Sequence, residues 1–85
     1  MTTSEDLREL GARFRAREQA TVEHAEVLRR NALVWWQGGA AEEYRRRVAE
    51  RSRSLDQLAR DYAATARLVD TTAEIIDLAP ESWPP

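Results

Sequence analysis

The segment Trp35-Trp36-Gln37-Gly38-Gly39-Ala40 interrupts a chain of 85 residues that contains one other glycine and no proline in its first 79 positions. Glycine adopts backbone angles that other residues rarely reach, so adjacent glycines predict a chain reversal. Arg30 precedes the reversal and Glu42 follows it, where a helix end favours a cation and a helix start favours an anion. We therefore expect two helices joined by a turn at residues 37–39.

Before the turn, apolar residues recur every three or four positions, which predicts a helix over residues 4–36. Thr3 or Ser4 can cap its start, with Asp6 in the first turn where the helix dipole favours an acid. Gly11 is the one weak point, because glycine costs about 1 kcal/mol relative to alanine inside a helix. The apolar positions are Leu7, Leu10, Phe14, Val22, Ala25, Leu28, Ala32 and Trp35.

After the turn, a seven-residue repeat predicts a second helix over residues 40–78. Its large positions are Val48, Leu55, Tyr62, Val69 and Ile76, in phase with Ala41. Small residues follow four positions later at Ser52, Ala59, Ala66 and Ala73. A row of large residues beside a row of small ones lets another helix approach closely. Proline ends the helix, so residues 80–85 are expected to form a flexible tail.

Folding the chain at the glycines places residue i roughly opposite residue 77 minus i. Large residues from the two helices then face one another: Leu28 meets Val48 or Ala49, Val22 meets Leu55, Phe14 meets Tyr62 and Leu7 meets Val69. The predicted fold class is all-α, an antiparallel helical hairpin that occupies residues 1–79 as one domain.

A hairpin of this kind is a rod, because a compact chain of this length has a radius of gyration of about 12 Å and the first helix alone spans roughly 48 Å. A two-helix rod leaves much of each apolar stripe in water, and pairing two hairpins into a dimeric four-helix bundle covers it. The dimer could be a homodimer or a heterodimer. The residues expected to carry it are Leu7, Phe14, Leu28, Val48, Leu55, Tyr62, Val69 and Ile76.

Charge is distributed unevenly along the predicted rod. Residues 42–60 carry a net charge of +2 and residues 61–81 a net charge of −4. Two copies packed antiparallel would bring unlike charges together. Within the helices, the spacing also predicts the ion pairs Glu9–Arg13, Glu26–Arg30, Glu42–Arg46, Glu43–Arg47 and Asp56–Arg60.

The composition argues against several classes of protein. A net charge of −2 does not suggest a nucleic-acid-binding protein. The longest apolar run is the five residues 32–36, far below the roughly 20 that a membrane span needs, and no apolar signal-peptide core follows Met1. The absence of cysteine excludes disulfides and thiolate metal sites.

No catalytic residue, metal site or cofactor is expected. His24 is the only histidine, and Thr21 stands where a bundle di-iron site needs a glutamate, so His24 is interpreted as structural or interfacial. Arg45-Arg46-Arg47 is flanked by acids, which favours a solvated or partner-facing surface over a phosphate site. For Trp35 and Trp36, a hydrophobic plug at the turn and a partner contact remain equally open.

The turn residues are similar to those of a known family. Trp36-Gln37-Gly38 between two long helices, followed by Ala40 and then Tyr44, resembles the WXG family of small type VII secretion proteins, the Esx or early-secreted-antigen-like group. The family pattern is Trp-x-Gly-x-Ala, with an aromatic residue four positions later. The motif positions here are Trp36, Gly38, Gly39, Ala40 and Tyr44, and the resemblance extends over about residues 4–78.

The resemblance implies a non-enzymatic hairpin that dimerises with itself or with a paralogous WXG or effector protein. Such proteins are leaderless substrates of the type VII machinery of actinobacteria and related bacteria, or partners that escort effectors to it, cytoplasmic before export and extracellular after it. The family's export signal, Tyr-x-x-x-Asp/Glu, is missing, because Ala66 follows Tyr62 and Val48 follows Tyr44 at the fourth place. The alternative is a cytoplasmic adaptor or immunity-type protein that binds a toxin or effector and is not exported.

Overall fold

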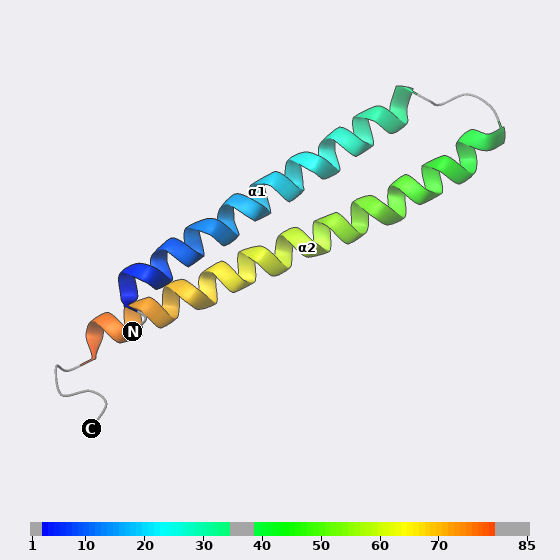
Figure 1. Ribbon diagram of the computed structural model, residues 1–85. Helices are drawn as coiled ribbons and strands as arrows, with labels where there is room; N and C mark the ends of the chain where they lie inside the picture. Colours follow the sequence, from blue (N-terminus) through cyan, green and yellow to red (C-terminus); the bar gives the residue numbers. More distant parts are fainter. Residues whose placement is uncertain (1–2, 35–38, 80–85) are drawn as a thin grey trace.

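Two long helices make up the structure (Figure 1). The computed structural model describes residues 3–34 and 39–79, with side chains for 3–32 and 42–79. Helix α1 spans Ser4–Val34 and helix α2 spans Gly39–Leu78. The described residues contain no strand, and the predicted all-α class is confirmed.

The helix boundaries differ slightly from the predicted ones. α2 begins at Gly39, which the sequence placed in the turn, and it ends at Leu78 as predicted. α1 begins at Ser4 as predicted and is described as far as Val34; its predicted end, at residues 35 and 36, lies outside the described part of the chain. The predicted tail at 80–85 also lies outside it.

Thr3 caps the start of α1, not Ser4. The Asp6 backbone N–H donates to the Thr3 hydroxyl, and the Thr3 N–H donates back to the Asp6 carboxylate, both at 3.1 Å. The Leu7 N–H then donates to the Thr3 carbonyl, which closes the first turn. This reciprocal arrangement satisfies backbone donors that an α-helix start otherwise leaves without partners. Ser4 is free to contact α2 instead.

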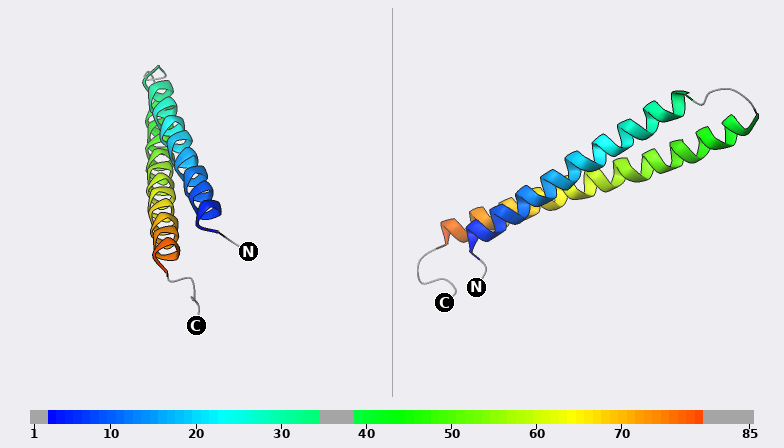
Figure 2. Two further views of the ribbon diagram at one scale, coloured as in Figure 1. Left: turned by 90° about the vertical axis from the view of Figure 1, so that its left-hand side faces the viewer. Right: turned by 45° about the horizontal axis from the view of Figure 1, so that its top comes forward.

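The helices run antiparallel and side by side, which gives a rod of 68 × 16 × 16 Å (Figures 1 and 2). Its radius of gyration is 19.5 Å, against about 12 Å for a compact chain of the same length. The start of α1 lies beside the end of α2 at one end of the rod, and the end of α1 and the start of α2 lie at the other end (Figure 1). The predicted antiparallel hairpin is confirmed.

Small residues form the seam between the helices. The predicted row of small residues in α2 is buried throughout, from Ser52 to Ala73. α1 contributes Gly11, Ala25 and Ala32, also buried. Because most of the interior is methyl groups, the helices pack closely but the core between them is thin.

The predicted pairing of Phe14 with Tyr62 is confirmed. Val22, predicted to face Leu55, is instead 40% exposed. The rings of Phe14 and Tyr62 lie 6.1 Å apart between centroids and are tilted by 36°. This separation is within the range of favourable aromatic pairs. Gly11 faces the Ala66 carbonyl, again the partner that the 77 minus i rule assigns.

Candidate partner-binding surface

A ladder of ion pairs closes one flank of the seam. Three arginines of α1 pair with three aspartates of α2: Arg8 with Asp77, Arg15 with Asp70 and Arg29 with Asp56. The pairs are seven and fourteen residues apart, so they recur on the same side of the hairpin. Val22 and Ala63 occupy the place of the rung between the second and third pairs.

Each rung is a surface interaction. The six side chains are between 31 and 51% exposed. Exposed ion pairs contribute roughly 0 to 1 kcal/mol each. The ladder therefore contributes little to the stability of the fold. Its main effects are to favour one alignment of α1 against α2 and to keep this flank polar.

The ladder also corrects a sequence prediction. Asp56 was expected to pair with Arg60 four residues later in the same helix. It binds Arg29 across the seam instead, and Arg60 donates to Gln57 at 2.9 Å. The spacing rule considers only neighbours on one helix, whereas Asp56 faces the other helix. The predicted Glu43–Arg47 pair is present at 3.3 Å, and Arg46 also reaches Glu43.

The opposite flank carries exposed apolar side chains among polar ones. On each helix, a ladder residue comes one position after a large seam residue. A residue that comes one position before a small seam residue therefore lies on the flank of the seam opposite the ladder. Two of those positions hold Leu10 and Leu58, which are 39 and 40% exposed, and Tyr44, 38% exposed, lies fourteen residues before Leu58 on the same side. The other positions hold polar side chains: His24, Asn31, Arg51, Thr65 and Thr72. We call Leu10, Tyr44 and Leu58, together with Phe14 and Tyr62, the apolar flank.

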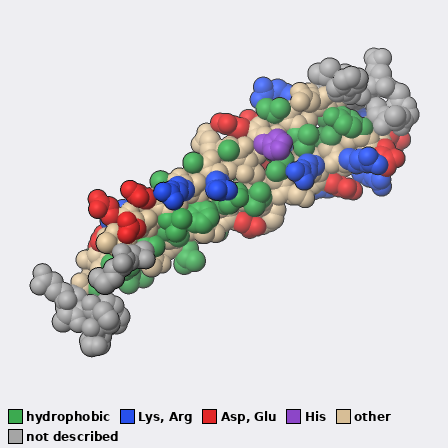
Figure 3. Space-filling view, in the orientation of Figure 1, with side chains coloured by type: hydrophobic (Ala, Val, Ile, Leu, Met, Phe, Trp, Pro, Cys, Tyr) green, Lys and Arg blue, Asp and Glu red, His purple; other side chains and the backbone are tan. Residues whose placement is uncertain are grey.

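A shallow hollow lies on this flank, with a volume of about 290 Å³. Leu10, Phe14 and Tyr62 supply its apolar lining, and Arg13 and Arg17 form its charged edge. Leu68 and Ile75, 67 and 63% exposed, extend the apolar surface around α2 away from the seam. Figure 3 shows hydrophobic side chains in a broken band along the rod, interspersed with charged ones.

The residues predicted to carry dimerisation fall into three groups. Val48 and Leu55 are buried at 8% exposure inside the single hairpin. Ile76 is 42% exposed. The rest are only half-buried: Leu7, Phe14, Leu28, Tyr62 and Val69.

The predicted turn motif is described only in part. Trp36 and Gly38 lie outside the described residues, as does Trp35. Gly39 and Ala40 form the start of α2, and Tyr44 is exposed on the apolar flank. His24, expected to be structural or interfacial, is exposed on α1.

Two features of the surface were missed at the sequence level. The first is the ladder. A signal for it exists, because the residue numbers of each arginine and aspartate pair sum to 85, as they do when two antiparallel helices pair at regular positions. The second is the role of Gly11 as a point of close approach, where its missing side chain leaves room for Asp70. Residue spacing alone carries no signal for that contact.

At the open end of the rod, one acid is electrostatically perturbed. Hydrogen bonds from the Ser4 hydroxyl, and secondarily from the Arg8 guanidinium, lower the pKa of Asp77 below its ordinary value of 3.8. The Asp77 carboxylate thus connects the start of α1 to the last turn of α2.

Within the described residues, no group of three or more histidine or carboxylate side chains is arranged to hold a metal ion. Neither described helix combines the length and the apolar character that crossing a membrane requires. The chain matches no family model, no curated protein and no solved structure.

Proposed function

We propose that this chain is a non-enzymatic, WXG-like hairpin that pairs with a second hairpin in a four-helix bundle and serves type VII secretion as a substrate or co-secreted partner. One observation supports the pairing above all. The most deeply buried core residues are Ala25, Ala66 and Ala73, whereas the large side chains of Phe14 and Tyr62 are only half-buried.

The hydrophobic effect is the reason that a partner is expected. Burial of apolar surface contributes about 25 cal/mol per Å², and alanine methyl groups offer little such surface. The apolar flank provides the larger area, and a second hairpin seated on it would complete a core of normal thickness. The flank that carries the ladder of ion pairs is polar and therefore suited to contact with water.

The charge of α2 supports an antiparallel partner. Residues 42–60 carry a net charge of +2, and residues 61–79 carry −3 from Asp61, Asp70, Glu74 and Asp77 against Arg67. Both halves of α1 are neutral, so the gradient along the rod comes from α2. An antiparallel copy would place the basic turn end beside the acidic open end.

The link to secretion rests on the residues Trp36, Gly38, Ala40 and Tyr44. A second candidate is an adaptor or immunity-type protein that holds a toxin or effector in the cytoplasm. Neither tyrosine of residues 1–85 is followed at the fourth place by an acid, which supports this candidate. Ala66, the residue four after Tyr62, is buried in the seam at 1% exposure. The secretion proposal does not need a signal in this chain if the chain is exported together with a partner that carries the signal.

Two measurements test these proposals separately. Light scattering of the purified protein, alone and with the product of an adjacent gene, measures assembly. A monomer under both conditions would contradict the proposed four-helix bundle. Secretion of a tagged chain, compared between strains with and without a functional type VII apparatus, measures export. Retention in the cells of both strains, with the partner present, would favour the adaptor.

A further inference from the structure

Exposed apolar side chains are spread along the whole side of the hairpin that carries the apolar flank. Leu10, Tyr44 and Leu58 belong to the flank itself. Val27 comes 17 residues after Leu10, and Ile75 comes 17 residues after Leu58, a spacing of two heptads plus three that keeps both on this side of their helices. The five side chains are between 38 and 63% exposed. They form a row along the rod that one hairpin leaves uncovered.

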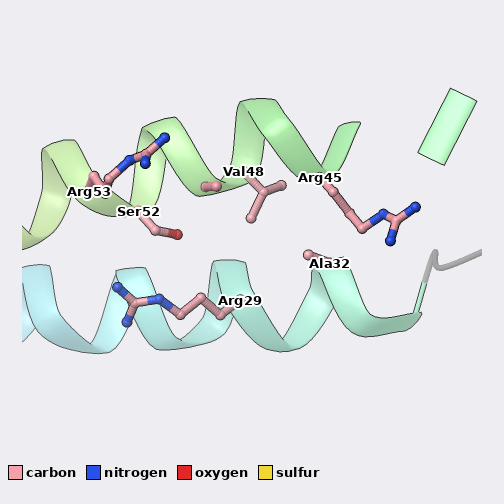
Figure 4. Close-up of a pocket in the computed structure, with 7 residues that line it drawn as sticks. Arg29, Ala32, Arg45, Val48, Ser52 and Arg53 are labelled. Carbon is pink, nitrogen blue, oxygen red and sulfur yellow. The ribbon is translucent and has the colours of Figure 1, made fainter. Parts of the chain in front are cut away.

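The other side of the hairpin is less suited to a partner. It carries the ion-pair ladder, and covering those charges would remove them from water at a large cost. A groove of about 440 Å³ also opens on this side, since its lining includes the ladder residue Arg29 and Ala49, one position after Val48. Three arginines line this groove, as does Ser52, whose buried hydroxyl has no hydrogen-bond partner among the described residues (Figure 4).

Symmetry limits how two copies of the chain can meet on the apolar flank. In a dimer with a two-fold axis, both molecules use the same surface. The charge gradient of α2 favours antiparallel rods, with residues 42–60 of one copy beside residues 61–79 of the other. When two such rods lie face to face and antiparallel, the axis crosses them, so α1 lies on α1 of the second copy and α2 lies on α2.

The lengths of the helices set the register of such a dimer. α1 extends over Ser4–Val34 and α2 over Gly39–Leu78, so rods that overlap fully have the axis near residue 19 of α1 and near residue 58 of α2. Residue i of α1 then lies opposite roughly residue 38 minus i of the second copy, and residue i of α2 opposite roughly residue 117 minus i.

The exposed apolar residues match this register. Leu10 falls within one residue of the position opposite Val27 of the second copy, and Tyr44 within two residues of the position opposite Ile75. Leu58 lies at the axis, beside Leu58 of the second copy. Because the register comes from the helix lengths alone, the match of the apolar row is independent support for it.

Charges on α1 match the register as well. Arg13 and Arg17 form the edge of the hollow on the apolar flank. The positions opposite them are roughly residues 25 and 21 of the second copy, and the exposed Glu23 lies between these two. Among the described residues, none of these three side chains takes part in an ion pair within its own chain.

We propose that the partner of this chain is a second copy of itself, related by a two-fold axis that crosses α1 near residue 19 and α2 near Leu58. Leu10 packs on Val27 of the second copy, Tyr44 packs on Ile75, and the two Leu58 side chains meet at the axis. The inference rests on the four-helix bundle of the proposed function and adds the identity of the partner and the residues that meet.

The test uses single cysteines, because the chain has none of its own. A disulfide requires two Cα atoms within about 7 Å. Leu58→Cys should form a covalent dimer under mild oxidation. Leu10→Cys and Val27→Cys should each stay unlinked alone and should link to each other when mixed. Ala64→Cys, exposed on α2 away from both flanks, is the matched control and should stay unlinked on a denaturing gel.

A charge reversal tests the register in solution, with the dissociation constant of the dimer measured by analytical ultracentrifugation. Arg17→Glu should raise this constant about fivefold, and adding Glu23→Arg should restore it. The two positions are six residues apart, which is not a spacing at which side chains of one helix meet, so restoration reports a contact between copies. Arg53→Glu, exposed on the side of the ladder, should leave the constant unchanged.

Several results would overturn the pairing. One is a Leu10→Cys chain that links to itself, and another is a Leu58→Cys chain that links no more than Ala64→Cys. A third is a chain that is a monomer alone and forms a one-to-one complex with the product of an adjacent gene, which would leave the four-helix bundle of the proposed function intact. A monomer under both conditions would contradict the bundle as well.

Discussion

Gly11 and Asp70 occupy the same small space between the helices. A Cβ atom on Gly11 would lie 2.6 Å from Oδ1 of Asp70, closer than real Cβ contacts come. Asp70 is held in this position by its ion pair with Arg15. The nearest backbone atom, the Ala66 carbonyl oxygen, would be 3.7 Å away, an ordinary contact. The requirement for glycine at position 11 of α1 therefore comes from a single carboxylate.

This relationship predicts that the effect of Gly11→Ala depends on residue 70. In the original chain, the gain of about 1 kcal/mol in helix propensity is offset by displacement of Asp70 from Arg15, so the free energy of unfolding should change by less than about 0.5 kcal/mol. In an Asp70→Ala background the space is empty, and Gly11→Ala should stabilise by about 1 kcal/mol. Urea unfolding of the four chains gives the coupling.

The opposite result would be equal destabilisation by Gly11→Ala in both backgrounds. It would mean that the backbone of α2 at Ala66, and not the carboxylate, sets the limit on how closely the helices approach.

Two leucines three residues apart on α2 should respond differently to a charge. Leu55→Asp places an unpaired carboxylate at a position that is 8% exposed, and should destabilise the hairpin by about 3 kcal/mol or more, with loss of helicity. Leu58→Asp lies on the apolar flank at 40% exposure. It should keep the helical circular dichroism signal and lose assembly in light scattering.

Ala64→Asp is the matched control, since it adds the same charge at an exposed position of α2 away from both flanks. It should retain both helicity and assembly. If Leu58→Asp assembled as well as Ala64→Asp, the apolar flank would not be the partner surface.

Extension of the ladder gives another prediction. Val22→Arg combined with Ala63→Asp would supply the missing rung between Arg15–Asp70 and Arg29–Asp56. The two changes should couple favourably by about 0.5 kcal/mol in a double-mutant cycle at low salt, and the coupling should shrink at 1 M salt. Absence of coupling at any salt concentration would show that positions 22 and 63 do not form an ion pair as the other rungs do.

The fold could be predicted from the sequence because its signals are periodic. The repeat through Val48, Leu55 and Tyr62 indicates which side of α2 faces α1, and a reversal at the glycines predicts the Phe14–Tyr62 contact, which is confirmed. The distribution of burial could not be predicted in the same way. The row of alanines draws the helices so close that the large residues beside them are left at the edges of the seam.

The surface was less predictable than the fold because its contacts cross between helices. Asp56 has an arginine four residues later on its own helix, and the local rule selects Arg60; only the three-dimensional arrangement brings Arg29 to it. The unpartnered hydroxyl of Ser52 follows from a side-chain orientation that residue type does not specify.

The final prediction concerns pH at the open end of the rod. The hydrogen bond from the Ser4 hydroxyl, followed by that from Arg8, lowers the folded-state pKa of Asp77 below the value of 3.8 expected in the unfolded chain. A depressed carboxyl pKa contributes stability that is fully present above 3.8 and is lost as the pH falls through the folded-state value.

Ser4→Ala should raise the pKa of Asp77 toward 3.8, while Thr3 and Asp6 still cap α1. A ¹³C NMR titration of the Asp77 carboxyl measures the shift, and faster amide exchange in the last turn of α2 below pH 3.8 would accompany it. An Asp77 that titrates identically in the original chain and in Ser4→Ala would show that the two helix ends are not joined through this hydroxyl.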